Sequence, residues 1–134
     1  MKKYVFILLM FCLWACGKEN SIKGKEYVYL APSGFQITLG FDLTENRYFG
    51  KGVNKFFGFY NRDQNKLSFQ EPSSTMMMGN RRHMAEEENF LDALSRVQFF
   101  EVTDTDLVLI TQGNERFVLT RKPNSFLKES TNEK

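Results

Sequence analysis

Cysteine and histidine are almost missing from this chain of 134 residues, which has two cysteines and one histidine. Both cysteines, Cys12 and Cys16, lie near the start, so no thiol pair remains further on to form a disulfide, and packing must hold the domain together. Any Ser-His-Asp triad or multi-histidine zinc site would depend on His83. We interpret His83 as a solvent-exposed residue at the entry of a helix, and we expect no metal site and no cofactor.

An excess of charge of one sign is also missing. The chain has 18 Lys and Arg against 16 Asp and Glu. Lys2 and Lys3 belong to the predicted leader described next, and without these two the mature chain has 16 basic residues against 16 acidic ones. A balanced surface argues against nucleic-acid binding and against a polybasic contact with a membrane.

The longest apolar run lies at the start of the chain, over residues 4–13, directly after the basic pair 2–3. A basic start, an apolar run too short to span a bilayer and a small residue at its end are typical of a signal peptide. Cys16 follows the small Ala15, whereas Cys12 follows a bulky Phe. We therefore predict a lipoprotein signal peptide over residues 1–15 and a lipid on Cys16. A non-lipidated secretory signal and an anchor helix are the alternatives.

These features predict how the chain is organised. After the signal peptide we expect a polar tether over residues 16–25, one folded domain over residues 26–122 and a flexible polar tail over residues 123–134. Removing 15 of the 134 residues leaves 119, enough for one domain with a core. The lipid would anchor the domain in the bacterial cell envelope, at the outer membrane, on its periplasmic face or at the cell surface.

A period of two dominates the domain. Ile37, Leu39, Phe41 and Leu43 alternate with polar or small residues, which is typical of a strand with one buried face. Residues 44–46 are typical of a turn. Further β-rich runs, separated by turn-forming residues such as those at 61–65, are predicted at residues 47–54, 56–60, 66–70, 97–102, 107–111 and 116–121.

One segment, from Met84 to Ser95, has a helical period instead. It holds no Gly, Pro or β-branched residue, and Met84, Leu91 and Leu94 recur at helical spacing. Glu86, Glu87 and Glu88 fall in its predicted first turns, where negative charge favours the helix dipole. Successive helical positions point in different directions, so we interpret these carboxylates as a solvated face. The pattern predicts a mainly β (α+β) domain in which a single amphipathic helix lies on an antiparallel sheet.

Three consecutive methionines, Met76, Met77 and Met78, invite a copper interpretation, because thioether sulfur suits Cu(I). Neighbours in an extended segment alternate faces, so at most two of the three can converge. We expect the methionines to fill the gap between helix and sheet instead.

An aromatic run covers residues 56–60. Alternation predicts that Phe57 and Phe59 lie on one side of a strand and that Phe56 and Tyr60 lie on the other. One pair belongs in the core, and the sequence leaves open which pair is exposed. Exposed apolar patches usually mark binding. A possible ligand or partner groove is predicted from Phe56, Phe57, Phe59, Tyr60, Leu91 and Leu94.

The same stretch resembles a family pattern. Residues 52–60, with Gly52, Asn54 and Gly58, are similar to the G-C-N-x-F-x-G-x-Y stretch of the META domain, the family of heat-shock-inducible HslJ-type envelope lipoproteins. Residues 75–79, which begin with Thr75, resemble its T-x-M-x-C-like stretch, and a helix and a β-meander follow in the same order. The two family cysteines are replaced here, by Val53 and Gly79, which removes any thiol chemistry.

The resemblance implies a small antiparallel, partly open barrel-like sheet crossed by one helix, no established enzyme activity, and a link to envelope stress and to tolerance of novobiocin. The fold is also similar to that of secretin pilot lipoproteins, which hold acyl chains or a partner peptide. Our first hypothesis is a non-catalytic, lipid-anchored envelope protein with an unknown protein partner. The alternative is a carrier or chaperone that holds an acyl chain or an apolar peptide between helix and sheet. We interpret Gly52, Asn54, Gly58 and Thr75 as structural.

We predict that Cys16→Ala leaves an uncleaved or soluble protein, because the modified thiol is lost, while Cys12→Ala changes nothing. Cell fractionation with acyl-chain labelling is the measurement. Label retained after Cys16→Ala would rule out this residue as the lipid site.

Overall fold

The structure is a computed structural model that describes residues 21–122. The predicted signal peptide, the lipid site at Cys16 and the predicted tail lie outside the described residues. The described part contains β1 (Glu26–Leu30), β2 (Gln36–Phe41), β3 (Arg47–Lys51), β4 (Lys55–Asp63), β5 (Lys66–Phe69), β6 (Ser73–Ser74), α2 (Arg81–Ser95), β7 (Val97–Val102), β8 (Asp106–Thr111) and β9 (Arg116–Arg121).

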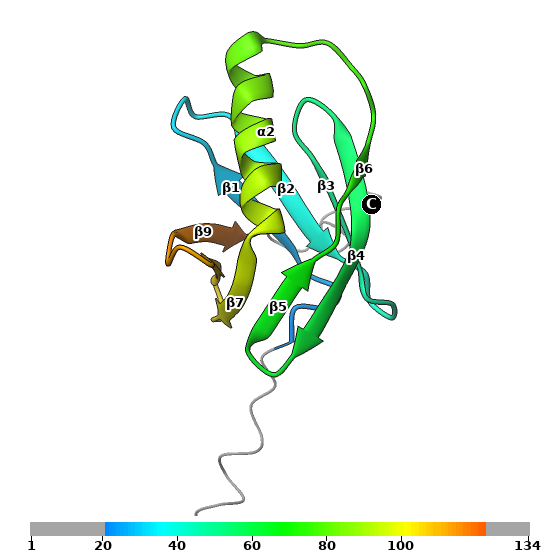
Figure 1. Cartoon of the computed structure of the whole chain (residues 1–134), viewed down its shortest axis with the longest axis vertical. Helices are drawn as coiled ribbons and strands as arrows, with labels where there is room; N and C mark the ends of the chain where they lie inside the picture. The colour runs from blue at the N-terminus through cyan, green and yellow to red at the C-terminus, as the bar shows by residue number, and fades with distance from the viewer. Residues whose placement is uncertain (1–20, 123–134) are drawn as a thin grey trace, which may run out of the picture.

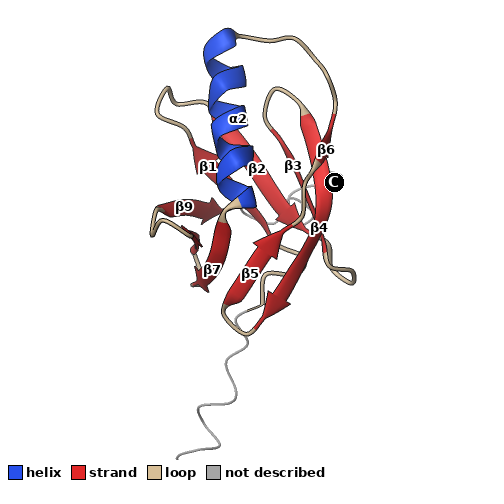
Figure 2. Cartoon of the chain, in the orientation of Figure 1, coloured by secondary structure: helices blue, strands red, loops and turns tan. Residues whose placement is uncertain are grey.

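The sheet closes into an antiparallel barrel. The strand order is β3-β2-β1-β9-β8-β7-β5-β4, and β4 pairs back onto β3 (Figure 1). The short β6 pairs with the first part of β4, at Phe56 and Phe57. The pairing between β5 and β7 is short, because these strands share a single paired position, Lys66 opposite Phe99. Helix α2, the one helix of residues 21–122, packs against β5 and lies across the sheet (Figure 2). The predicted β-barrel-like sheet with one helix is confirmed.

Aromatic side chains fill the inside of the barrel. The rings pack edge to face, as in the pair Phe41–Tyr60 at 5.4 Å and the pair Tyr48–Phe69 at 5.0 Å between centroids. From the helix, Phe90 stacks on Tyr29 at 5.0 Å. The largest fully buried side chains are Tyr27, Tyr48, Tyr60, Phe41, Phe56 and Phe90. The domain therefore has a packed core without any disulfide.

The period of two predicted most strands, with errors at several strand ends. The strand predicted over residues 47–54 ends at Lys51, because residues 52–54 form the turn between β3 and β4. Leu43 was expected on the buried face, but β2 ends at Phe41 and Leu43 is 72% exposed, because the chain turns at Asp42. The turn expected over residues 61–65 is also wrong. Strand β4 continues to Asp63, since its polar end is exposed and still pairs with β5, and the turn shrinks to Gln64-Asn65.

The start of the domain lies earlier than predicted. Ile22 is completely buried in the core, and the backbone N–H of Gly24 donates to the carbonyl of Phe41 at 3.0 Å. Gly24 has φ of +72°, a conformation that glycine adopts without strain. The tether predicted over residues 16–25 is therefore wrong for its last residues. Strand β1 was not predicted either, because its burial pattern does not alternate cleanly.

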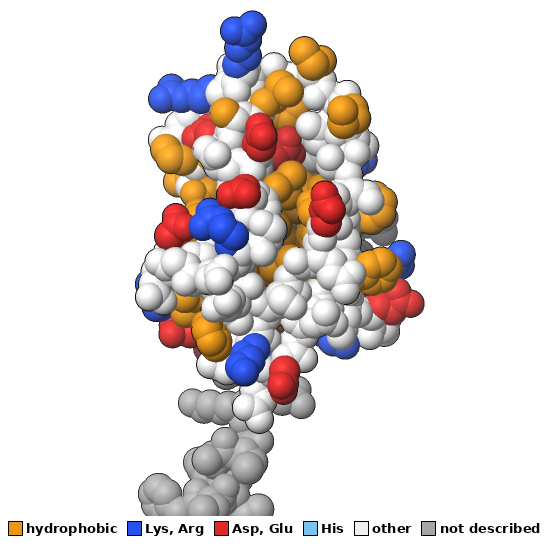
Figure 3. Space-filling view, in the orientation of Figure 1, with side chains coloured by type: hydrophobic (Ala, Val, Ile, Leu, Met, Phe, Trp, Pro, Cys, Tyr) orange, Lys and Arg blue, Asp and Glu red, His pale blue; other side chains and the backbone are white. Residues whose placement is uncertain are grey.

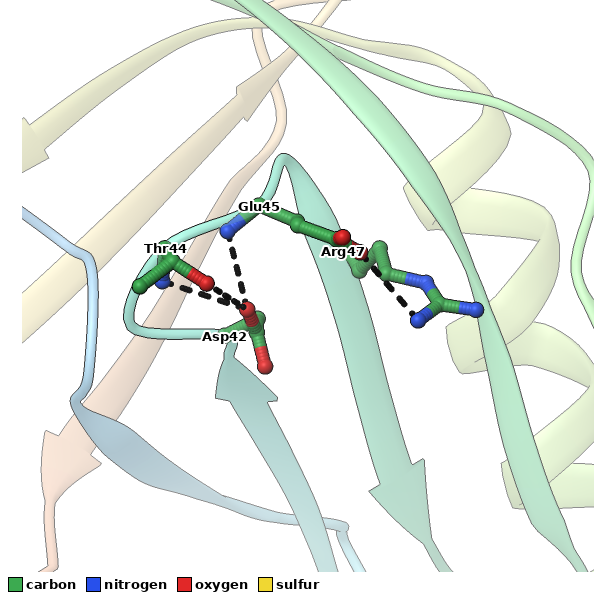
Figure 4. Close-up of polar contacts among 4 residues, drawn as sticks. All are labelled: Asp42, Thr44, Glu45 and Arg47. Carbon is green, nitrogen blue, oxygen red and sulfur yellow. Dashed lines mark hydrogen bonds and ion pairs between the residues drawn. The ribbon is translucent and has the colours of Figure 1, made fainter.

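The turn between β2 and β3 is built around one carboxylate (Figure 4). Asp42 Oδ2 accepts from the backbone N–H of Glu45 at 2.8 Å and of Thr44 at 3.1 Å. Arg47 pairs with Glu45 at 3.2 Å across the same turn. These backbone N–H groups, that of Glu45 first, hold the pKa of Asp42 below its ordinary value of 3.8.

The helix begins three residues before the predicted Met84. Asn80 is its N-cap residue, and its side-chain oxygen accepts from the backbone N–H of Arg82 at 2.8 Å. This cap was not predicted, because the apolar period starts only at Met84. Within residues 21–122, no helix has the length and apolarity needed to cross a membrane.

We expect Asp42→Asn to lower the free energy of unfolding at neutral pH, because an amide oxygen accepts these N–H groups less strongly than a carboxylate. A depressed folded-state pKa stabilises the fold above the unfolded-state value of 3.8, and this contribution is lost as pH falls through the folded-state pKa. The difference between the wild type and Asp42→Asn should therefore shrink on acidification below pH ~4. Urea denaturation across pH measures it. Asp104→Asn, an exposed turn residue, is the control, and a difference that grows on acidification would contradict the interpretation.

Candidate interaction site

A buried carboxylate joins the helix to the hairpin of β3 and β4. Glu87 is only 4% exposed, and its two oxygens accept from Asn54, from the backbone N–H at 3.0 Å and from the side-chain amide at 3.2 Å. No ion pair among the described residues involves Glu87. A carboxylate in this position is costly unless it is hydrogen-bonded, so Asn54 compensates most of its lost hydration.

The same asparagine holds the segment that leads from β6 to the helix, residues 75–79, which we name the strap. Asn54 Oδ1 accepts from the Thr75 hydroxyl at 3.1 Å and from the backbone N–H of Met77 at 2.6 Å. Thr75 and Lys55 exchange two further hydrogen bonds, of 3.0 and 3.1 Å. Hairpin turn, strap and helix therefore form one hydrogen-bonded unit.

The two motif glycines make room for neighbouring side chains. A Cβ on Gly52 would lie 3.0 Å from Glu87 Oε1, and a Cβ on Gly58 would lie 2.8 Å from the Tyr48 hydroxyl. That hydroxyl donates to the carbonyl of Gln70 at 2.5 Å, where the chain leaves β5 for β6. Burial raises the pKa of Tyr48 to about 12. Gly52, Asn54 and Thr75 thus belong to or adjoin the unit of hairpin turn, strap and helix, whereas Gly58 lies beside the separate hydrogen bond of Tyr48.

The two positions where the family pattern has cysteine lie side by side. A Cβ on Gly79 would be 3.7 Å from the Cβ of Val53, a separation typical of disulfides. In this chain the valine side chain fills the space left by the glycine, at 2.7 Å from that Cβ position. An apolar contact thus joins strap and hairpin at this point.

The methionines of the strap do not fill the core, and the expectation that they would is wrong. Met76 is 94% exposed, Met78 is 89% exposed, and Met77 is exposed as well. The strap runs along the top of the molecule outside the sheet, and Figure 3 shows hydrophobic side chains there. Strap atoms close to the helix satisfy hydrogen bonds instead, as where the Gly79 N–H donates to Met84 Sδ at 3.4 Å.

The carboxylates of the helix do not form one solvated face, which corrects the interpretation from sequence. Because the helix starts at Arg81, none of them lies in its first turn. Glu87 is buried, whereas Glu86 accepts from the hydroxyl and the backbone N–H of Ser33 at the β1–β2 turn. These Ser33 bonds hold the pKa of Glu86 below its ordinary value. Of these three glutamates, only Glu88 is a free solvent-exposed carboxylate.

The histidine is also less exposed than expected. His83 is half-buried, and its ring stacks flat on Phe35, with 4.2 Å between centroids and 4° between planes. With the contact between Glu86 and Ser33, this stacking fixes the β1–β2 turn on the first half of the helix. Among residues 21–122, no group of three His, Cys, Asp or Glu is placed to hold a metal ion.

The aromatic run of β4 is divided by the sheet. Phe56 and Tyr60 are buried in the barrel, whereas Phe57 and Phe59 are exposed on its outer face, at 58% and 52%. Leu94 is buried under the helix and Leu91 is half-buried beside it. The six residues predicted as one groove therefore lie in two places separated by the sheet, and they do not line a common groove.

Sequence reasoning missed Glu87, although the sequence holds a signal for it. Glu87, Phe90 and Leu94 are spaced by three and four residues, so they share one side of the helix. Leu94 was expected to face the core, and Phe90 and Glu87 follow the same direction. An acidic residue in line with core residues predicts a buried partner for it, here Asn54.

The matched family and the similar structures agree with this architecture. A model of the META domain matches residues 19–124. Comparison with curated protein sequences gave no match. An NMR structure of a protein from Burkholderia xenovorans aligns with a TM-score of 0.63 at 18% identity, over 77% of this chain and 85% of that chain. A second protein NMR structure aligns with a TM-score of 0.55 at 16% identity, over 74% and 90%. At such identities the likeness shows the fold alone.

We predict that Asn54→Ala and Glu87→Ala each lower the free energy of unfolding by ~1–3 kcal/mol, because each leaves buried polar groups without their partners. Thr75→Val should cost less, since Thr75 is exposed. Urea denaturation is the measurement, with the exposed neighbour Glu88→Ala as the control.

The double variant of Asn54 and Glu87 should lose less stability than the two single losses added together, because both substitutions remove the same contact. Additive losses would mean that the two residues act independently.

Proposed function

The chain belongs to the META domain family, and from this premise we propose that it is a non-catalytic, lipid-anchored protein of the bacterial cell envelope that binds a protein partner. Its setting would be envelope stress or antibiotic tolerance, as the resemblance implies. The strap is the binding surface in this proposal.

The exposure of three consecutive methionines carries the proposal. Large apolar side chains gathered on a surface usually mark an interaction site. Methionine is well suited to such a surface, because its flexible thioether side chain adapts to different partners. Met77 is fixed through its backbone by Asn54. A strap with a fixed backbone and adaptable side chains loses little chain entropy when it binds.

The filled interior supports partner binding over the alternative of an acyl-chain carrier. A carrier of this type needs space between helix and sheet. Phe56, Phe90 and Leu94, which meet at that junction, are 1–2% exposed, and the rings of Phe56 and Phe90 are 6.4 Å apart. Figure 3 shows apolar side chains in the middle of this face of the molecule, beside α2. A chain could enter only by displacing core aromatics.

The polar groups of the site support a binding role as well. Both oxygens of Glu87 are occupied by Asn54, and the Tyr48 hydroxyl donates to a backbone carbonyl. General acid–base or nucleophilic catalysis needs a group that is free to reach a substrate. These side chains are used to hold the frame.

A lipid on Cys16 would keep the domain close to the bilayer. Ile22, six residues later, is buried in the core. Six residues span at most about 20 Å when fully extended. The domain would therefore remain next to the membrane surface, with little freedom to move away from it.

We predict that replacing Met76, Met77 and Met78 together by Ser abolishes capture of the partner from the protein's own envelope and leaves stability unchanged within ~0.5 kcal/mol, because the three side chains are exposed. Pull-down followed by denaturation measures both effects. The matched control replaces three exposed apolar residues elsewhere, Leu30, Leu43 and Val118, by Ser.

A locked variant tests whether the strap binds in its present conformation. Val53→Cys with Gly79→Cys should form a disulfide and keep partner capture, because the Cβ separation already fits one. Capture that survives the loss of the methionines would show that the strap is not the binding surface. Capture that disappears on locking would show that the strap does not bind in its present conformation.

A further inference from the structure

The outer face of the β3–β4 hairpin carries only cations and aromatic rings. Three cross-strand pairs follow one another along it: Arg47 opposite Phe59, Phe49 opposite Phe57, and Lys51 opposite Lys55. We call these six residues the hairpin face. All six side chains are exposed, because the intervening residues Tyr48, Phe56 and Tyr60 point into the barrel.

Charge on the hairpin face is uncompensated where the lysines lie. Arg47 is paired with Glu45 and lies 5.4 Å from the Phe59 ring centre. Neither Lys51 nor Lys55 takes part in any of the ion pairs among residues 21–122. Both lysines line a surface hollow whose acidic lining residue is Glu26, and Glu26 is paired with Lys122 at 3.5 Å. A chain with balanced charge thus has a locally positive surface.

Two lysines directly opposite each other weaken a hairpin. Like charges at paired positions of an antiparallel sheet repel, and among residues 21–122 neither lysine forms an ion pair with a carboxylate. An anion bound between Lys51 and Lys55 would relieve it. Both lysines line a shallow hollow of about 590 Å³ together with the rings of Phe49 and Phe57. The same hollow is also lined by Glu26, Gln36, Thr38 and Lys122, so it offers ammonium groups and polar side chains beside aromatic rings, a combination that suits a phosphate headgroup with the start of an acyl chain.

We propose that the hairpin face docks on an anionic lipid bilayer. Aromatic rings concentrate at the level of lipid headgroups, and basic residues are attracted by anionic lipids. The aromatic rings and Arg47 would suit a protein partner too, but the two facing lysines favour a lipid surface, because lysine is depleted at protein–protein interfaces. The proposal rests on the lipid anchor proposed above, and it adds which side of the domain meets the membrane.

The start of the domain lies beside the Arg47 end of the hairpin face. Gly24, two residues after the buried Ile22, bonds to the end of β2 and contacts Leu43 in the turn that leads to Arg47. An anchor at Cys16 would therefore hold Ile22 within about 20 Å of the bilayer, and with it the neighbouring Arg47 end of the hairpin. Strand β3 is only five residues long, so its whole length would lie near the membrane. Docking would then cost the anchored domain little further freedom of movement.

A single tryptophan tests the docking. Phe57→Trp becomes the sole tryptophan of the lipidated mature protein, because Trp14 belongs to the predicted signal peptide, and this protein is reconstituted into bilayers that contain brominated phosphatidylcholine. We expect strong quenching when phosphatidylglycerol is present and weak quenching when it is absent. Lys55→Gln should lower the ratio of docked to undocked protein about fivefold, the effect expected for one lysine near an anionic surface. High salt should lower the ratio as well.

The controls separate this proposal from its premise. Lys66→Gln removes an equally exposed lysine from the first position of another strand, and a reporter at Val118→Trp lies on another strand of the barrel, so neither should follow the lipid charge. Acyl labelling of Cys16 tests the anchor independently. Quenching that does not depend on lipid charge would overturn the docking, and so would equal effects of Lys55→Gln and Lys66→Gln. A photo-crosslinker at position 57 that captures protein but no lipid in cells would also overturn it.

Discussion

The contact between Glu87 and Asn54 is the constraint on which the outer parts of this fold depend. A buried carboxylate without a cation must receive hydrogen bonds, and the backbone and side-chain N–H groups of one asparagine supply them. Asn54 can do so only if the hairpin turn lies against the middle of the helix. The side-chain oxygen of Asn54 then accepts two hydrogen bonds from the strap. Three segments far apart in sequence are thereby fixed by one residue.

This constraint matters because the barrel itself is weakly closed. Strands β5 and β7 share a single paired position, so backbone hydrogen bonds alone do little to hold the ring shut there. The helix packs against β5 and inserts Phe90 and Leu94 into the core. At its first half, the contacts Glu86–Ser33 and His83–Phe35 bind it to the β1–β2 turn. The helix therefore completes the barrel and does not merely cover it.

Both proposed binding surfaces begin at the turn that Asn54 fixes. The strap lies on one side of it, and Lys51 and Lys55 of the hairpin face flank it directly. The two surfaces differ in chemistry, since one is made of adaptable thioethers and the other of rings and ammonium groups. Under the two proposals, one domain would contact a membrane and a protein partner at the same time.

The sequence by itself determined the β-rich class, most strand positions, the single helix and the family, because apolar periodicity and motif residues are local properties that survive without tertiary context. It also separated Phe57 and Phe59 from Phe56 and Tyr60, since alternation is a rule of strand geometry. Only the tertiary structure decided which pair is exposed, that Glu87 is buried, that the methionines lie outside the core and that lysines face each other. Each of these depends on what another segment places opposite the residue, and strand pairing and helix docking bring those segments together across long stretches of chain.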